Sequence, residues 1–155
     1  MIITDLLDLK AITIDLEHLT KKEILGDLVD LLVLSGGIKK NEKADILKKL
    51  VERENLGSTG IGKGVAIPHA KCPKVKKMTA AFGISKKGID FKSLDGEVTY
   101  IFFLLIAPGE TPGPHLKALA KISRLLDDKF IRDRLRASKT PQEILEIITN
   151  EQKKV

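Results

Sequence analysis

The feature that most constrains the fold is a short and almost continuously apolar run, Val98–Ala107. Its length suits a β-strand, and a strand without alternating polar residues is covered by other elements on both faces. The run falls well short of the roughly 18 apolar residues that span a membrane. Because segments with helical periodicity lie on either side of it along the chain, the sequence predicts an α/β fold in which helices sandwich a sheet.

Two helices are predicted before this run. The first begins with a capping box, in which Thr20 caps the helix and Glu23 lies three residues on, and it ends at the glycine pair 36–37. Asn41 is predicted to cap the second helix, which ends near Asn55. The apolar residues expected to face the core from the second helix are Ala44, Leu47, Leu50 and Val51.

The rest of the chain predicts further strands and helices. A strand is expected at 78–85, a turn at Asp95–Gly96 and a loop at 108–114. Residues 130–136 either continue the helix that follows this loop or start a new one. The residues expected to face the core from that helix are Leu116, Leu119, Ala120 and Ser123. The last helix begins with an N-cap, a first-turn proline and a capping-box glutamate, which are Thr140, Pro141 and Glu143.

Length and cysteine content favour one domain with its own hydrophobic core. A chain of 155 residues matches a single domain, 1–155, that needs neither disulfides nor a metal ion. The one cysteine, Cys72, forms no metal or redox motif, and we interpret it as a small apolar side chain. Asp5 and Asp8 stand where a signal peptide would be basic, so we expect a cytoplasmic protein that does not insert into a membrane.

Charge is unevenly distributed along the chain. There are 27 Lys and Arg residues against 21 Asp and Glu, and the excess comes from residues 36–92. This segment could attract a phosphate-bearing molecule or partner. With five phenylalanines, one tyrosine and no tryptophan, the chain offers little for base stacking, so we expect no nucleic-acid partner. Binding of a nucleotide or nucleic acid stays an alternative, which predicts an affinity that falls steeply with salt.

A glycine-rich segment, Gly57–Ala70, has the least helical sequence of the chain, GSTGIGKGVAIPHA. Its first seven residues fit the G-x-x-x-x-G-K part of a P-loop, whose backbone N–H groups and lysine bind phosphates. The next position is Gly64, which has no hydroxyl for magnesium. A P-loop also follows a strand and precedes a helix, whereas here a helix comes first and the β-like run Val65–Ile67 follows. Both mismatches argue against a nucleoside triphosphate site.

His69, near the end of this segment, offers a different chemistry. A neutral imidazole can attack phosphorus and carry the phosphoryl group as phosphohistidine, with no obligatory metal. Donors of Ser58, Thr59 and Gly60 could bind the phosphoryl oxygens. Pro68 stiffens the chain just before the histidine. A lone histidine is more often structural, and it is these neighbours that favour a role in phosphoryl transfer.

Two further residues could act together with His69. His115 follows the segment 112–114 and opens a predicted helix, whose N-terminus favours an anion. Arg53 lies in the last turn of the second predicted helix and could present its guanidinium to a phosphoryl group. Either could instead be an ordinary polar residue at a helix end. His18 lies outside any glycine-rich setting, and we interpret it as structural or exposed.

A long motif connects Arg53 to His69. It reads Arg53-Glu54-x-Leu56-Gly57-Ser58-Thr59-Gly60-Ile61-Gly62 and then Gly64-Val65-Ala66-Ile67-Pro68-His69. This motif is similar to the signature of the fructose/mannitol-type enzyme IIA domains of the phosphoenolpyruvate:sugar phosphotransferase system, which include the nitrogen-regulatory IIA proteins. The resemblance extends over nearly the whole chain and includes Ile3–Leu7, Gly88–Phe91, the apolar strand ending at Ala107-Pro108, and His115-Leu116-x-x-Leu119-Ala120.

The resemblance implies an α/β sandwich around a mixed sheet and the activity of a phosphotransferase component. His69 would take a phosphoryl group from the phosphohistidine of HPr or of its nitrogen-branch relative. It would then pass the group to a cysteine of an enzyme IIB domain for sugar uptake. His115 would orient or stabilise the phosphorylated imidazole, and Arg53 would neutralise phosphoryl charge. No cofactor is implied, and we expect a free-standing IIA.

Two outputs of such a carrier stay open. In one, the protein is a sugar-specific component of fructose/mannitol-type uptake, with IIB and IIC on other chains. In the other, it is a nitrogen-type regulator that controls partner proteins through its phosphorylation state. Transfer to a sugar-transport IIB, or its absence, would separate the two.

Overall fold

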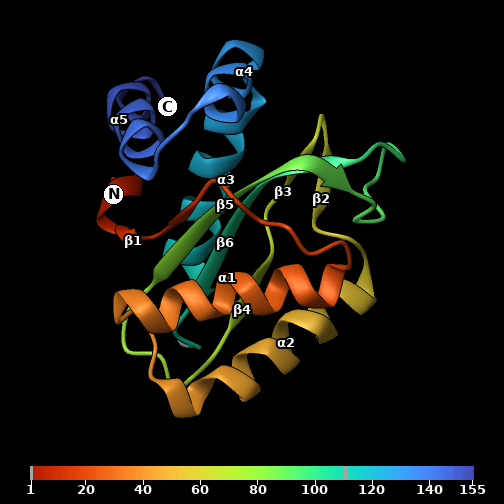
Figure 1. The fold of residues 1–155 in the computed structure, drawn as a ribbon. Helices are drawn as coiled ribbons and strands as arrows, with labels where there is room; N and C mark the ends of the chain where they lie inside the picture. The colour runs from red at the N-terminus through yellow and green to blue at the C-terminus, as the bar shows by residue number, and fades with distance from the viewer. Residues whose placement is uncertain (1, 110–111) are drawn as a thin grey trace.

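The computed structural model describes residues 2–109 and 112–155, and its centre is a six-stranded sheet (Figure 1). The strand order is β1-β5-β6-β3-β2, and β4 pairs with β6 outside this path. Pairing is antiparallel in β5/β6 and β2/β3 and parallel in β1/β5, β3/β6 and β4/β6, so the sheet is mixed as expected. The strands are β1 Leu7–Thr13, β2 Gly60–Gly62, β3 Val65–Ala66, β4 His69–Lys71, β5 Thr79–Ile89 and β6 Thr99–Ala107.

Helices cover both faces of this sheet. Figure 1 shows α1 and α2 on one side and α3, α4 and α5 on the other, which confirms the predicted sandwich. The helices are α1 Lys21–Ser35, α2 Lys43–Leu56, α3 Pro112–Asp127, α4 Lys129–Ala137 and α5 Pro141–Glu151. Short 3₁₀ turns are present at η1 Ile3–Asp5, η2 Lys40–Glu42 and η3 Gln152–Lys154.

The central strand β6 is buried on both faces. All of its residues except Tyr100 are buried. Phe102 and Phe103 point to opposite faces because successive side chains of a strand alternate. Phe102 meets Phe91 edge to face with ring centroids 5.3 Å apart, and Phe103 meets Phe82 in the same way at 5.6 Å. The apolar run that suggested a covered strand therefore forms the middle of the core.

The predicted caps of the first and last helices are confirmed. The Thr20 hydroxyl accepts a hydrogen bond from the backbone N–H of Glu23 at the start of α1. Thr140 does the same for Glu143 at the start of α5. Gly36 ends α1 in the left-handed conformation, with φ of 82°, which a residue without Cβ adopts at little cost.

The predicted start of α2 is wrong, whereas its predicted inner face is confirmed in part: Leu50 is buried, and Leu47 and Val51 pack against the core. Asn41 lies inside η2 and caps nothing; instead the backbone N–H of Lys39 donates to the carboxylate of Glu42. The 3₁₀ turn shifts the helix start to residue 43, and Ala44 in the first turn of the helix is exposed. The buried residues of α2 recur every four positions and are Ile46, Leu50 and Glu54.

The predicted start of α3 is also wrong, and its predicted inner face is confirmed only for Leu119, which packs against the core. The helix begins at Pro112, inside the expected loop 108–114, of which residues 110–111 lie outside the described residues. A proline is favoured at the first helical position because its missing N–H has no partner there. Leu116 and Ala120 are exposed instead of buried. The buried residues of α3 are His115, Ala118, Ile122, Leu125 and Leu126.

Of the two possibilities for residues 130–136, the structure shows a new helix. Asp128 caps α4, with its carboxylate accepting from the backbone N–H groups of Phe130 and Ile131.

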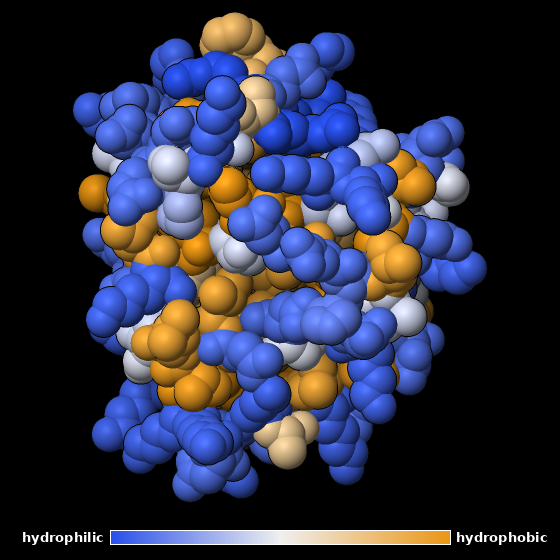
Figure 2. All heavy atoms as spheres, in the orientation of Figure 1, coloured by the Kyte–Doolittle hydropathy of each residue, from blue (hydrophilic) through white to orange (hydrophobic). Residues whose placement is uncertain are grey.

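On the face seen in Figure 2, hydrophilic side chains cover most of the surface, with apolar groups between them. Within 2–109 and 112–155, no helix is both long enough and apolar enough to cross a bilayer.

Candidate functional site

A proline break places His69 at the start of β4. β3 and β4 pair one after the other with the same strand, β6, and Ile67-Pro68 separate them. The backbone N–H of Ile67 turns away from β6 and donates to the carbonyl of Thr59 at 3.0 Å. Pro68 has no N–H, and its carbonyl accepts from the N–H of Leu105 at 2.9 Å. Strand pairing resumes at His69, beside the C-terminal half of β6.

An open cavity of about 530 Å³ lies where α2, β4 and α3 meet. Each element contributes one of the three residues predicted to act together, so the structure brings Arg53, His69 and His115 into one site. The lining residues on which the following argument depends are Lys49, Arg53 and Leu56 from α2, His69 and Lys71 from β4, and His115 and Leu116 from α3.

The hydrogen bond of His69 defines which ring nitrogen is free. Nδ1 lies 2.8 Å from the carbonyl oxygen of Ile67. Because a carbonyl only accepts, Nδ1 carries the proton and Nε2 of the neutral ring carries the lone pair. Burial lowers the pKa of His69 from 6.5, and the charge of Arg53 lowers it further, against opposing effects of the Ile67 carbonyl and Glu54. His69 is therefore a neutral imidazole near pH 7.

His115 is a second neutral imidazole beside the first. It is the fourth residue of α3 and only 4% exposed. The rings of His69 and His115 meet edge to face, with centroids 5.6 Å apart. Burial lowers the pKa of His115 to about 4, and repulsion from Lys71 and from His69 when it is protonated acts in the same direction. Its Nε2 is buried and has no hydrogen-bond partner among the described residues.

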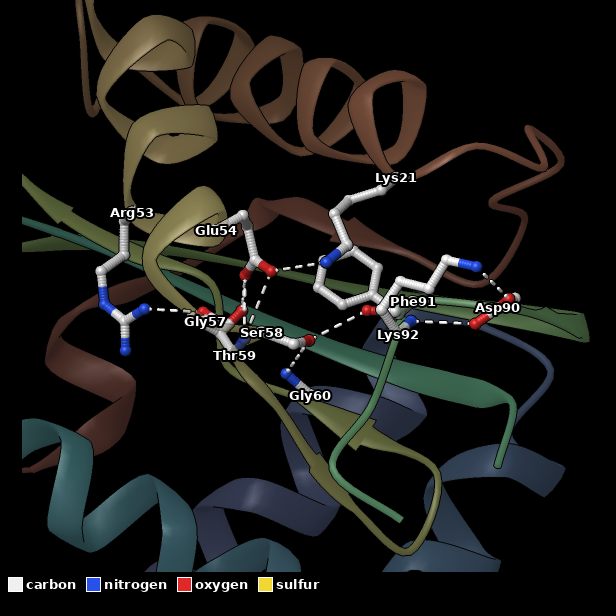
Figure 3. A network of polar contacts seen from close by, with 10 residues as sticks. All are labelled: Lys21, Arg53, Glu54, Gly57, Ser58, Thr59, Gly60, Asp90, Phe91 and Lys92. Carbon is white, nitrogen blue, oxygen red and sulfur yellow. Dashed lines mark hydrogen bonds and ion pairs between the residues drawn. The ribbon is translucent and has the colours of Figure 1, made fainter. Parts of the chain in front are cut away.

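Arg53 is held at the end of α2 by one hydrogen bond. Its Nη1 donates to the carbonyl oxygen of Gly57 at 2.8 Å, as Figure 3 shows. Gly57 has a φ of 154°, which a residue with a Cβ rarely adopts, so a glycine is what allows the carbonyl to face back toward the helix. No carboxylate of the described residues pairs with Arg53. Its remaining N–H groups can therefore donate to an anion in the cavity.

Three residues predicted to bind phosphate do not line the cavity. The Ser58 hydroxyl donates to the carbonyl of Phe91 at 2.9 Å and accepts from the N–H of Gly60 at 3.0 Å. Thr59 is buried, and both its N–H and its hydroxyl donate to the carboxylate of Glu54. Phosphate binding by Ser58, Thr59 and Gly60 stays a prediction, and their contacts indicate a structural role.

The P-loop-like stretch Gly57–Lys63 connects α2 to the β2/β3 hairpin. It follows a helix and leads into strands, as the sequence argument against a P-loop expected. The backbone N–H of Lys63 donates to the carboxylate of Asp95, and its Nζ lies 2.7 Å from the carboxylate of Asp127. Lys63 thus contacts carboxylates on the surface and does not line the cavity.

Other residues at the cavity were missed from sequence. Lys71 follows His69 by two positions on a strand, a spacing that puts both on one face and could have identified it. Leu56 and Leu116 are 85% and 68% exposed at the cavity, and nothing in the apolar pattern marks them as surface residues.

Among the described residues, no group of three or more His, Cys, Asp or Glu side chains is arranged to hold a metal ion.

The chain matches a known family over almost its whole length. The model of the family described as "Phosphoenolpyruvate-dependent sugar phosphotransferase system, EIIA 2" matches residues 5–151. A nitrogen regulatory protein of Bradyrhizobium diazoefficiens is 43% identical over 148 residues, which cover 96% of this chain and 95% of that protein.

A transport protein and a solved structure are similar as well. The fructose-specific EIIABC component of the Bacillus subtilis phosphotransferase system is 36% identical over 153 residues, covering 99% of this chain and 24% of that protein. The crystal structure of the nitrogen regulatory protein IIA-Ntr from Neisseria meningitidis superposes with a TM-score of 0.87. It is 34% identical, and the match covers 95% of this chain and 99% of that one.

Proposed function

Because this chain belongs to the EIIA 2 family of the phosphoenolpyruvate-dependent sugar phosphotransferase system, we propose that it carries a phosphoryl group on Nε2 of His69. The observation that carries this proposal is the 2.8 Å hydrogen bond from Nδ1 to the carbonyl of Ile67. That bond leaves the lone pair of a neutral imidazole on Nε2. The cavity supplies Arg53 and His115 beside it.

The proposed reaction is a direct transfer between two imidazoles. The Nε2 lone pair of His69 attacks the phosphorus of a phosphohistidine on the donor protein, and a new N–P bond forms. The donor's N–P bond breaks, and its electron pair returns to the donor imidazole. Such transfers depend mainly on positioning and on stabilising the charge of the phosphoryl oxygens. HPr or its nitrogen-branch relative is the proposed donor.

Arg53 and His115 would stabilise the transferred group. The N–H groups of Arg53 not bonded to Gly57 can donate to phosphoryl oxygens, which form strong charge-assisted hydrogen bonds with guanidinium. The Nε2 of His115 lacks a partner among the described residues, and a phosphoryl oxygen on His69 would supply one. Lys71 adds a further positive charge at the cavity.

The relatives favour a regulatory output for the carrier. The nitrogen regulatory protein resembles this chain over 95% of its own length. Transport is the second candidate, because the fructose-specific component is also similar over 99% of this chain. In that case the phosphoryl group would pass to a cysteine of an enzyme IIB. Action in the cytoplasm stays a prediction from sequence.

Mass spectrometry of the intact protein tests the carrier proposal. The protein is incubated with phosphoenolpyruvate, enzyme I and either HPr or its nitrogen-branch relative, at neutral or higher pH because phosphohistidine is acid-labile. We expect one phosphoryl group on the wild type and none on His69→Ala. His18→Ala is the matched control, since His18 bonds Asp27 away from the cavity and should not affect phosphorylation. Phosphorylation of His69→Ala, or none of the wild type with active donors, contradicts the proposal.

A second experiment separates the two outputs. The phosphorylated protein is mixed with fructose- and mannitol-type IIB domains, and transfer to their cysteines is followed by mass. In parallel, phosphorylated and unphosphorylated protein are used to capture partners from an extract of the source cells. Capture that depends on phosphorylation without transfer to IIB supports regulation, whereas transfer to IIB supports uptake.

A further inference from the structure

A partly buried ion pair lies next to the cavity without lining it. The carboxylate of Glu54, whose side chain is 3% exposed, lies 2.8 Å from Nζ of Lys21 at the start of α1. The same Nζ sits 4.4 Å from the ring centroid of Phe91, as Figure 3 shows. Removing charges from water is costly, and a pair of this kind persists only with further hydrogen bonds to its atoms. Those bonds show what the pair holds in place.

Among the described residues, the remaining hydrogen bonds of the Glu54 carboxylate go to Thr59. The backbone N–H of Thr59 lies 3.1 and 3.2 Å from the two carboxylate oxygens, and its hydroxyl donates to one of them. Glu54 is in the last turn of α2, and Thr59 is just before β2. The carboxylate therefore fixes the path of the chain between the helix and the hairpin.

From Thr59 the contacts continue to His69. The carbonyl of Thr59 accepts the backbone N–H of Ile67 at 3.0 Å, and the carbonyl of Ile67 accepts Nδ1–H of His69 at 2.8 Å. Each residue along this path is positioned by the one before it. The last bond is the one that leaves the lone pair on Nε2, so the tautomer of His69 depends on where Ile67 is held.

Arg53 depends on the same turn. It precedes Glu54 in the sequence, and its guanidinium bonds the carbonyl of Gly57, which lies between Glu54 and Thr59 along the chain. Anchoring both ends of this short segment fixes the Gly57 carbonyl. His69 and Arg53, which we propose to bind the phosphoryl group, are thus both positioned by the turn that Glu54 and Thr59 hold.

We propose that Glu54 is a positioning residue for phosphoryl transfer: paired with Lys21, its carboxylate holds Thr59 and so fixes the tautomer of His69 and the placement of Arg53. This inference rests on the proposed carrier function. It also gives Thr59 a role different from phosphate binding, since its hydroxyl acts on the carboxylate of Glu54 and not on the substrate.

The test combines a spectroscopic and a kinetic measurement on the full chain. Nitrogen-15 NMR of the imidazole reports which nitrogen of His69 is protonated, and it does not require phosphoryl transfer. Initial rates with the phosphorylated donor give kcat and KM. The variants are Glu54→Gln, which removes the charge at nearly constant shape, and Thr59→Val, which removes only the hydroxyl. Thr59→Ser keeps the hydroxyl, and Asp127→Asn, which loses a surface pair with Lys63, is the control.

We expect Glu54→Gln to populate the Nε2–H tautomer and to lower kcat about 10- to 100-fold, the scale of a small misplacement of reacting groups, with KM nearly unchanged. Thr59→Val should also populate the Nε2–H tautomer and lower kcat, each to a smaller extent. Thr59→Ser and Asp127→Asn should match the wild type. Circular dichroism verifies that each variant is folded. If Glu54→Gln does not fold, the tautomer and kcat of Thr59→Val alone test the inference.

Two results would overturn the inference. One is a folded Glu54→Gln or Thr59→Val protein with the wild-type tautomer and kcat. The other is a loss that appears only in KM, because that would place Glu54 in donor binding. If the wild type accepts no phosphoryl group while the variants still change the tautomer, the carrier function fails and the support of His69 by Glu54 stands.

Discussion

At the scale of single residues, the site places two neutral imidazoles side by side. A charged His115 next to His69 would repel a second positive charge, and burial already disfavours charge on both. A phosphorylated His69 reverses this situation, because the group carries negative charge that a neighbouring donor can stabilise. The unphosphorylated site thus suits a neutral nucleophile, whereas the phosphorylated site suits hydrogen-bond donors around the phosphoryl group.

The lowered pKa of His115 predicts a stability that depends on pH. Because the folded pKa is about 4 and the unfolded value is 6.5, the unfolded chain binds the proton more readily, so stability is complete above about pH 6.5 and falls as the pH drops toward 4. Full protonation of this one group would cost up to about 3 kcal/mol. Urea unfolding at pH 7 and pH 4.5 should show this loss in the wild type and a smaller one in His115→Gln. Equal losses in both proteins would contradict the prediction.

Arg53 should not be replaceable by lysine. Arg53→Lys keeps the positive charge but loses the planar fork that bonds Gly57 and faces the phosphoryl oxygens. We expect phosphoryl transfer to fall by about 10²-fold, as for the loss of one transition-state donor, while stability changes by less than about 0.5 kcal/mol. Arg124→Lys, an exposed residue of α3 outside the cavity, is the control. Wild-type rates in Arg53→Lys would show that a positive charge at this position, without the guanidinium geometry, is sufficient for phosphoryl transfer.

At the scale of elements, local signals predicted where α1 and α5 begin, but not where α2 and α3 begin or fully which way they face. Thr20 and Thr140 could be identified because a cap depends on residues three positions apart. The inner faces of α2 and α3 were predicted only in part because each buries a polar residue, Glu54 or His115, that an apolar pattern does not count. Their burial depends on partners distant in sequence, such as Lys21 for Glu54, 33 residues away.

The candidate site was predictable to a similar degree. The motif that ends at His69, together with Arg53 and His115, identified the three residues that the fold brings to one cavity. The hydroxyls of Ser58 and Thr59 look like phosphate ligands in sequence because nothing local shows where they point. Only the fold reveals that Glu54 and Phe91 are their partners.

Two glycines should respond in opposite ways to alanine. A Cβ on Gly83 of β5 would lie 2.4 Å from Leu16, between β1 and α1, and 3.2 Å from Leu28 of α1, so Gly83→Ala should displace Leu16 from the sheet and destabilise by about 1–3 kcal/mol. Gly26, inside α1, has nothing within 4 Å of the same position, and Gly26→Ala should stabilise by about 0.5–1 kcal/mol through helix propensity. Urea unfolding measures both. Equal signs would show that Leu16 does not pack on Gly83 of β5 as closely as the structure shows.

At the scale of the whole molecule, the cavity lining is positively charged on balance, with Lys49, Arg53 and Lys71 against Glu52. The basic segment 36–92 contains α2 and β4, which supply Lys49 and Lys71 to the lining. No carboxylate of the described residues pairs with either lysine. Unpaired cations around an open cavity attract an anionic partner and raise its rate of encounter. The phosphorylated donor is such a partner, since its phosphoryl group is anionic.

This arrangement predicts that donor binding depends on where charge lies and not only on its total. Lys49→Glu and Lys10→Glu change the net charge equally, but Lys10 is exposed on β1, which β5 and β6 separate from β4. At about 0.01 M salt, where screening extends over roughly 30 Å, we expect Lys49→Glu to raise the KM for the phosphorylated donor several-fold with little change in kcat. Lys10→Glu should change it much less. At about 1 M salt the screening length falls to roughly 3 Å, and the three proteins should converge. Equal effects of the two variants would show that net charge alone governs the encounter.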